Sequence, residues 1–240
     1  MQRLSKILLI LLFFGFSVGV DAQIGEPRTQ IAVGVNGGVA LNSMTFAPSI
    51  NQSQHIGPTM GLTFRVTSEK YFSALCALQL ELNYTRLGWT EDIIDAESNP
   101  LPDRYRRDLD YAQLPLLARL GWGREERGFQ FFFLLGPQVG WLMGERTTRS
   151  DAWTLTPEGV PDRPGEVFQQ YDLPVERRFE YGITGGIGVE LSTRAGHFLV
   201  EGRYYYGLSD IYGNAKADAF SRSSHGTIFA KVSYLFNLRK

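Results

Sequence analysis

The stretch Leu78-Gln-Leu-Glu-Leu-Asn-Tyr-Thr85 alternates apolar and polar side chains along its whole length. Successive side chains of a β-strand point to opposite faces, so this period of two predicts a strand with one apolar and one polar face. Leucine and tyrosine share the first face, whereas glutamine, glutamate, asparagine and threonine share the second.

The same alternation recurs in segments of about 10 to 14 residues, separated by clusters of turn-forming residues. After residue 23 no apolar run approaches the roughly 20 residues that a membrane-spanning helix needs. A chain of this kind can cross a membrane only as a closed barrel, because open sheet edges leave backbone groups unsatisfied in lipid. We predict eight strands, near residues 30–42, 56–68, 75–89, 108–123, 128–144, 178–192, 197–209 and 226–238.

The composition of the two faces decides which kind of barrel these strands form. A membrane barrel turns its apolar face to lipid and closes its polar face around the lumen. Here the apolar faces are continuous and aromatic, and the polar faces are rich in glycine, glutamine, glutamate and arginine. The sequence therefore predicts an all-β fold, an eight-stranded antiparallel up-and-down transmembrane β-barrel. A soluble ligand-binding barrel would require the aromatic faces to point inward.

Aromatic residues and loop lengths favour the membrane interpretation. The connections at 68–71, 123–128 and 193–196 are short, whereas the others are longer, and the 145–177 connection is the longest. Short periplasmic turns alternating with long outer loops are typical of outer-membrane barrels, as are girdles of aromatic residues at both interfaces. We expect the girdles to include Trp89, Trp122, Trp141, Phe179, Phe198, Tyr206 and Phe236.

The N-terminus is organised like a secretory signal peptide. Arg3 and Lys6 precede an apolar stretch over residues 7–20, and Val20-Asp-Ala22 fits the small-x-small cleavage rule. We expect a signal peptide over 1–22, a periplasmic segment over 23–29 and one barrel domain over 30–240, exported to the cell outer membrane.

Composition excludes several classes of function. A formal net charge of -1 and the lack of a basic run give no reason to expect a nucleic-acid partner. The single cysteine, Cys76, excludes an internal disulfide framework and a cysteine-rich zinc site. The glycine-rich runs 34–38 and 182–188 lead into no helix, so we interpret them as packing features of strands rather than phosphate-binding loops. No cofactor or metal is expected.

Four further stretches resemble a known family. They are Tyr111-Ala-Gln-Leu-Pro-Leu-Leu-Ala-Arg119, Leu135-Gly-Pro-Gln-Val-Gly-Trp-Leu-Met143, Tyr181-Gly-Ile-Thr-Gly-Gly-Ile-Gly-Val-Glu190 and Glu201-Gly-Arg-Tyr-Tyr-Tyr-Gly-Leu-Ser-Asp-Ile211. In this order, from Gln30 to the C-terminus, the chain resembles the PorT-like outer-membrane β-barrel family of Bacteroidetes. The resemblance implies a barrel without a catalytic motif. The PorT protein is associated with the type IX secretion system, so the resemblance also implies a link to secretion.

The polar faces carry charged residues that we expect to point into the lumen: Arg65, Glu81, Arg119, Glu180, Glu190, Glu201, Arg203 and Lys231. An eight-stranded barrel is just wide enough inside for side chains, so opposite charges there should pair and plug the lumen. On the lipid face, each arginine or lysine would cost roughly 2–4 kcal/mol at mid-bilayer. The alternative interpretation is a narrow ion path, which would make the protein a small passive, porin-like channel.

A lipid-modifying enzyme is a second alternative. Ser224 and His225 lie near the last outer loop, where His225 could meet Asp210 or Asp218. A catalytic triad is recognised by geometry, and no sequence motif accompanies these residues, so we expect no enzyme.

The outer loops are the place expected for recognition, because long loops on a rigid scaffold vary and bind. In the 145–178 connection the residues expected to bind a partner are Trp153, Phe168 and Tyr171; the alternative is a mobile cap. The mixed charges over 91–107 are interpreted as a solvated loop. We expect a monomeric, non-enzymatic barrel that stabilises the envelope or binds a partner. Its expected partners are outer-membrane lipid and lipopolysaccharide, the barrel assembly machinery, and a secretion-system or other envelope protein.

Overall fold

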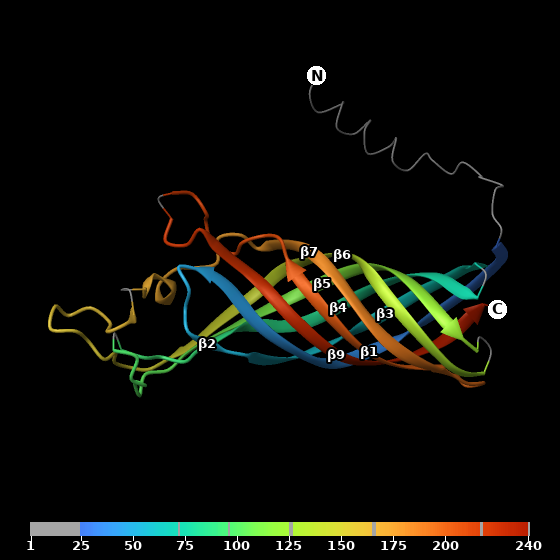
Figure 1. Ribbon diagram of the computed structural model, residues 1–240, viewed down its shortest axis with the longest axis horizontal. Coiled ribbons are helices and arrows are strands. Elements are labelled where there is room, and N and C mark those ends of the chain that lie inside the picture. The colour runs from blue at the N-terminus through green and yellow to red at the C-terminus, as the bar shows by residue number, and fades with distance from the viewer. Residues whose placement is uncertain are drawn as a thin grey trace, which may run out of the picture.

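The computed structural model describes residues 25–239, except 72, 96, 125–126, 165–166 and 217. Eight strands of this part of the chain close into a ring in which each pairs antiparallel with the next and β9 pairs with β1 (Figure 1). The predicted eight-stranded antiparallel barrel is therefore confirmed. The ring strands are β1 (Gly25–Ala47), β3 (His55–Tyr71), β4 (Ala74–Glu91), β5 (Tyr105–Gly123), β6 (Gly128–Arg149), β7 (Phe179–Ser192), β8 (His197–Gly207) and β9 (Arg222–Arg239).

The long and short connections lie at opposite ends of the barrel, as predicted. The long ones cover 48–54, 92–104, 150–178 and 208–221, and we call this the outer end. The beginning of β1 and the end of β9 lie at the other, periplasmic end (Figure 1). A short strand β2 (Gln52–Ser53) pairs with the last residues of β4 at the outer end. No helix in the described residues is long and apolar enough to cross a membrane.

Several predicted strand ends are wrong, mostly at the outer end. β1 continues to Ala47, β5 begins at Tyr105, β6 continues to Arg149 and β9 begins at Arg222. The strands continue there because their inward side chains, such as Phe46 of β1 and Tyr105 of β5, are still buried in the interior. Residues 25–29, predicted as part of a separate periplasmic segment, belong to β1. The predicted signal peptide over 1–22 lies outside the described residues.

The two faces of the barrel have the polarity of a membrane protein. Outward side chains such as Leu82, Phe131 and Val200 are exposed, whereas the polar side chains that alternate with them are buried in the lumen. Of the predicted girdle, six residues point outward and are exposed: Trp122, Trp141, Phe179, Phe198, Tyr206 and Phe236.

The girdle prediction is wrong for Trp89, whose side chain is 0% exposed. Trp89 has the same parity along β4 as the inward Glu81, so it points into the lumen although it lies near the strand end. A position near a strand end therefore predicts an interfacial aromatic residue only where the side chain also points outward.

The glycine-rich runs lie within strands β1 and β7, as the structural interpretation requires. A Cβ atom at Gly38 would overlap the backbone oxygen of Ala230 on the neighbouring strand, and one at Gly188 would overlap the ring of Phe132 inside the barrel. These glycines permit close backbone approach and packing of the interior.

Replacing Val232 with arginine should impair barrel assembly. Val232 points outward from the middle of β9 and is 58% exposed, so the variant places a charge against lipid at a cost of about 2–4 kcal/mol. Heat-modifiable gel mobility after refolding into lipid vesicles measures the folded fraction. The matched control is Glu158→Arg, because Glu158 is exposed in an outer loop. Equal folding of both variants would contradict the assigned lipid face.

Candidate functional site

The periplasmic half of the lumen contains a carboxylate held by three basic side chains. Glu190 on β7 accepts hydrogen bonds from Arg65 and Arg119, with a shortest N···O distance of 2.6 Å to each. The Nδ1 atom of His197 lies 2.6 Å from the other oxygen of the same carboxylate. Arg119 also stacks over the ring of Phe132, with its guanidinium carbon 4.1 Å from the ring centroid. Five strands therefore contribute to one buried cluster.

A second cluster lies further along the lumen around Glu81 on β4. Its carboxylate accepts hydrogen bonds from Arg203 (3.0 Å) and from the ammonium of Lys231 (2.7 Å). Arg203 also donates to Glu201, two residues before it on β8. Two acids and two bases balance each other here, and all four side chains are buried.

The structure places the eighth predicted lumen residue, Glu180, apart from these clusters. Among the described residues it forms no ion pair with lysine or arginine; the Nε2 atom of His225 approaches it to 3.5 Å. The hydroxyls of Tyr111 and Tyr205 lie beside its carboxylate. At this height of the lumen the carboxylate therefore lies beside two tyrosines and a histidine, without a lysine or arginine partner among the described residues.

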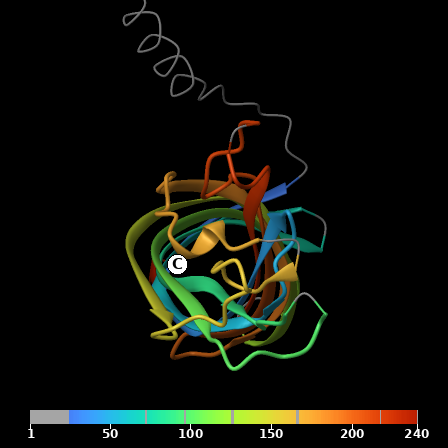
Figure 2. The ribbon, with the colours of Figure 1, turned by 90° about the vertical axis from the view of Figure 1, so that its left-hand side faces the viewer.

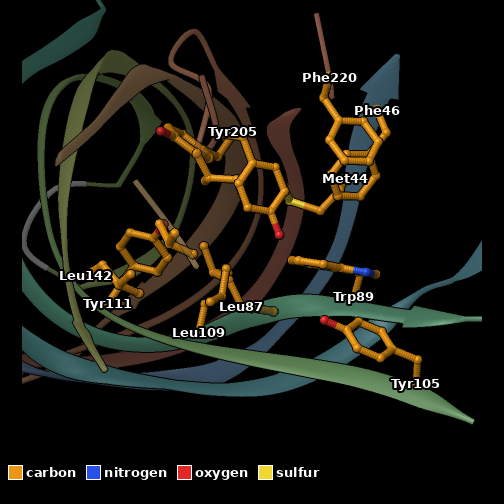
Figure 3. Packing of buried hydrophobic residues seen from close by; sticks show 14 of the residues in the cluster. Met44, Phe46, Leu87, Trp89, Tyr105, Leu109, Tyr111, Leu142, Tyr205 and Phe220 are labelled. Atoms are coloured by element: carbon orange, nitrogen blue, oxygen red, sulfur yellow. The ribbon is translucent and has the colours of Figure 1, made fainter. Parts of the chain in front are cut away.

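Above Glu180 the lumen is filled by an aromatic and aliphatic core. Leu87, Trp89 and Leu109 are 0% exposed, and Trp89 packs edge-to-face on Phe46 at a centroid distance of 5.2 Å. Figure 3 shows these side chains reaching from strands β1, β4 and β5 into the same part of the interior. We refer to this cluster as the outer core; its buried members are Ala40, Met44, Phe46, Leu87, Trp89, Ile93, Tyr105, Leu109, Tyr111, Leu142, Tyr171, Val175, Tyr205, Ile211, Tyr212, Phe220 and Phe229.

The described residues of the 150–178 connection cover the outer core. This segment, with the short 3-10 helix η2 (Gln169–Tyr171), lies across the barrel opening (Figure 2). Tyr171 packs on Tyr105 of β5 at 4.8 Å between centroids, and its hydroxyl donates to Glu91 of β4 at 2.8 Å. Arg107 of β5 donates to the backbone oxygen of Leu173 at 2.6 Å. These contacts fasten the connection to the barrel wall as a lid.

Buried charges hold the lid on the side of β4 and the 92–104 connection. Arg163 forms an ion pair with Asp103 at 2.9 Å and donates to the Tyr171 hydroxyl at 2.8 Å. Glu91 also accepts from Gln170 at 3.2 Å. Glu91 ends β4, beyond the outward apolar residues, and burial raises the pKa of its carboxyl. Burial, reinforced by Glu91, raises the pKa of the Tyr171 hydroxyl too.

The three residues expected to bind a partner take part in this packing. Tyr171 is buried and stacks on Trp153 at 4.5 Å, and Phe168 is partly buried against the outer core. Trp153 is also partly buried, with the Arg163 guanidinium 5.1 Å from its ring centroid. In this arrangement the aromatic side chains contribute to the lid more than to the exposed surface.

The residues considered for a catalytic triad do not assemble. His225 points into the lumen, where its Nδ1 atom lies 3.2 Å from the side-chain oxygen of Asn42. Asp210 instead accepts from the backbone nitrogen of Ser223, and Asp218 accepts from that of Ala215. Within the part of the chain that the structure describes, no group of three or more histidine, cysteine, aspartate or glutamate residues could hold a metal ion.

Sequence reasoning missed the outer core and the residues that fasten the lid. Part of the signal was present, because Leu87, Leu109 and Tyr111 are apolar or aromatic residues with inward parity. They mark the level at which the inward face changes from charged to apolar. No comparable pattern identified Arg163 or Asp103, whose partners lie in another connection.

Comparisons with known proteins agree with the fold. A family model described as "Outer membrane protein beta-barrel domain" matches residues 21–213. A search of curated proteins found no match.

Solved structures with a similar fold include two small outer-membrane proteins. The attachment invasion locus protein Ail of Yersinia pestis shares 12% identity, with a TM-score of 0.36 over 85% of this chain and 98% of that chain. The outer membrane protein OprG from Pseudomonas aeruginosa shares 14% identity, with a TM-score of 0.45 over 88% of this chain and 98% of that chain.

Proposed function

Since the chain belongs to the outer membrane protein beta-barrel domain family, we propose that it is a closed, non-conducting and non-enzymatic barrel that acts through its outer loops. The observation that carries the proposal is the filling of the lumen at two levels by different chemistry. Buried ion pairs around Glu190 and Glu81 occupy the lower level, and the outer core beneath the lid occupies the upper level.

The two levels close the lumen for different physical reasons. In the lower level the charged side chains are bound to one another, so they replace hydration with fixed ion pairs. In the upper level, the close-packed aromatic and aliphatic side chains of the outer core fill the space that a hydrated ion would need. A passive channel would need both levels to open together. What remains accessible is the outer-loop surface, which favours an envelope-structural or partner-binding role.

The refolded protein should be electrically silent in planar bilayers. Single-channel recording on preparations whose folding is verified by heat-modifiable mobility tests this expectation. The Glu81→Leu variant should be silent as well when folded, because the outer core still closes the upper level. A steady, reproducible conductance of the wild-type protein would overturn the closed-barrel proposal in favour of a channel.

The resemblance to PorT-like barrels supports a more specific partner, a secretion-system or other envelope protein. The lid would present such a partner with a fixed surface, because hydrogen bonds fasten it to strands β4 and β5 and an ion pair fastens it to the 92–104 connection. Lipid and lipopolysaccharide would surround the apolar band. The lipid-modifying alternative finds no support in the placement of His225, which faces Asn42 and Glu180 inside the barrel.

A further inference from the structure

A pocket opens on the outer surface beside the lid, with a volume of about 380 Å³. It lies between the 48–54 connection, the end of β4 with the residues that follow it, and the lid residues Arg163, Pro164, Val167 and Gln170. We call it the loop pocket. Its volume falls at the lower end of the range of about 300–1,000 Å³ that small-ligand sites occupy.

The walls of the loop pocket are aliphatic rather than aromatic. Ile50, Ile93 and Ile94 line it, whereas the aromatic side chains of the lid pack into the outer core instead. Sugars and quaternary ammonium groups are usually recognised by aromatic faces, so this lining suits neither. An aliphatic segment of a ligand would be desolvated against the isoleucines.

Two of the three buried polar residues that line the loop pocket carry acceptor oxygens, and the third, Arg163, already donates to Asp103 and Tyr171. Glu91 and Gln170 line it and are 7% and 1% exposed, and the Oε1 atom of Gln170 has no hydrogen-bond partner among the described residues. An unsatisfied buried acceptor calls for a donor. A ligand that donates hydrogen bonds would therefore satisfy this oxygen, and one that only accepts them would not.

The charge balance of the loop pocket selects between kinds of donor. The Glu91 carboxylate is bound by neutral donors, namely Trp89, Gln170 and Tyr171. Asp92, exposed at the rim, adds a second acid. Among the described residues that line the pocket, Arg163 is the one base, and it is paired with Asp103. Glu91, Asp92 and Asp103 thus place three acids around one base, so an ammonium group would meet net negative charge, which a hydroxyl would not exploit.

We propose that the loop pocket binds a primary ammonium group on an aliphatic stem, with the ammonium at Glu91 and Gln170 and the stem against the isoleucines. The proposal rests on the proposed role of the outer loops in binding and specifies its chemistry. A free aliphatic amine and a lysine side chain of a protein partner share this chemistry.

Binding can be measured by saturation-transfer NMR on the barrel in lipid nanodiscs, with n-butylammonium, 1-butanol and butanoate as probes. We expect n-butylammonium to receive the strongest saturation, and Glu91→Gln to reduce it severalfold. Ile94→Arg, which places a cation in the pocket wall without altering Glu91, should reduce it as well. Glu158→Gln is the matched control, because it removes one exposed acid outside the pocket and should leave binding unchanged.

Nα-acetyl-lysine amide distinguishes the two sources of the ligand. Its binding with a similar dependence on Glu91 would support a lysine side chain, whereas binding of n-butylammonium alone would support a free amine. Equal saturation in wild type, Glu91→Gln and Ile94→Arg, or a preference for butanoate, would overturn the proposal. A wild-type barrel that conducts ions but still binds n-butylammonium would overturn the closed-barrel proposal and would support the ligand proposed for the loop pocket.

Discussion

Replacing Glu81 with leucine is expected to destabilise the folded barrel by about 3–5 kcal/mol, the cost of leaving buried charges without their partner. Glu81 accepts hydrogen bonds from both Arg203 and Lys231, and it is 1% exposed. Its loss leaves two bases in the lumen with Glu201 as the remaining acid of the cluster. Equilibrium unfolding in guanidinium, from folded protein in lipid vesicles, measures the change.

The double variant Glu81→Leu with Lys231→Met is the informative control. It removes one acid and one base, so the Arg203–Glu201 ion pair remains and the cluster stays neutral. Apolar replacement of a buried pair is often neutral or stabilising, so the double variant should be clearly more stable than the single one. If the double variant loses as much stability as Glu81→Leu, lost packing rather than uncompensated charge dominates.

Replacing Trp89 with alanine should cost about 3–5 kcal/mol, as for other large aromatic side chains in packed interiors. The indole contacts Phe46 and Tyr105, and the Arg107 guanidinium lies 5.7 Å from its ring centroid. Its truncation leaves a cavity at the middle of the outer core. The same unfolding measurement in lipid vesicles reports the loss.

Trp122→Ala is the matched control. It is the same substitution, made at a tryptophan that points outward and is 36% exposed. We expect a clearly smaller loss of stability. Quenching of tryptophan fluorescence by brominated acyl chains provides a second readout: Trp122→Ala should lower the quenched fraction, whereas Trp89→Ala should not. If the quenched fraction falls in Trp89→Ala, Trp89 lies at the lipid interface and its assignment to the lumen is wrong.

The comparison of Trp89 with Trp122 shows what the alternation of apolar and polar residues can predict, which is the face of the barrel that each side chain occupies. Parity along a strand assigns a face, and it correctly predicts that Glu81, Arg203 and Lys231 point into the lumen. Applied strictly to β4, the same rule also places Leu87 and Trp89 inside. The error on Trp89 came from giving position along the strand more weight than parity.

Strand parity could not predict which lumen charges pair with which. Arg65 and Glu190 are 125 residues apart in sequence, and their contact depends on the relative stagger of strands β3 and β7 around the ring. The isolation of Glu180 from the arginines has the same origin. Alternation fixes the face of a residue, whereas the stagger fixes its height.

The amino-acid sequence alone was enough to predict the eight strands of the ring, their antiparallel order, the alternation of short and long connections, and the outward apolar face. Each follows from local periodicity and from the requirement that lipid leaves no open sheet edge. The three-dimensional fold was needed to see that the described part of the 150–178 connection folds back over the outer core and forms the loop pocket with residues from two other connections. Pairs such as Arg163 with Asp103 form between loops that have no repeating pattern. Their contacts arise from the closure of the ring, which brings the loops together at one end.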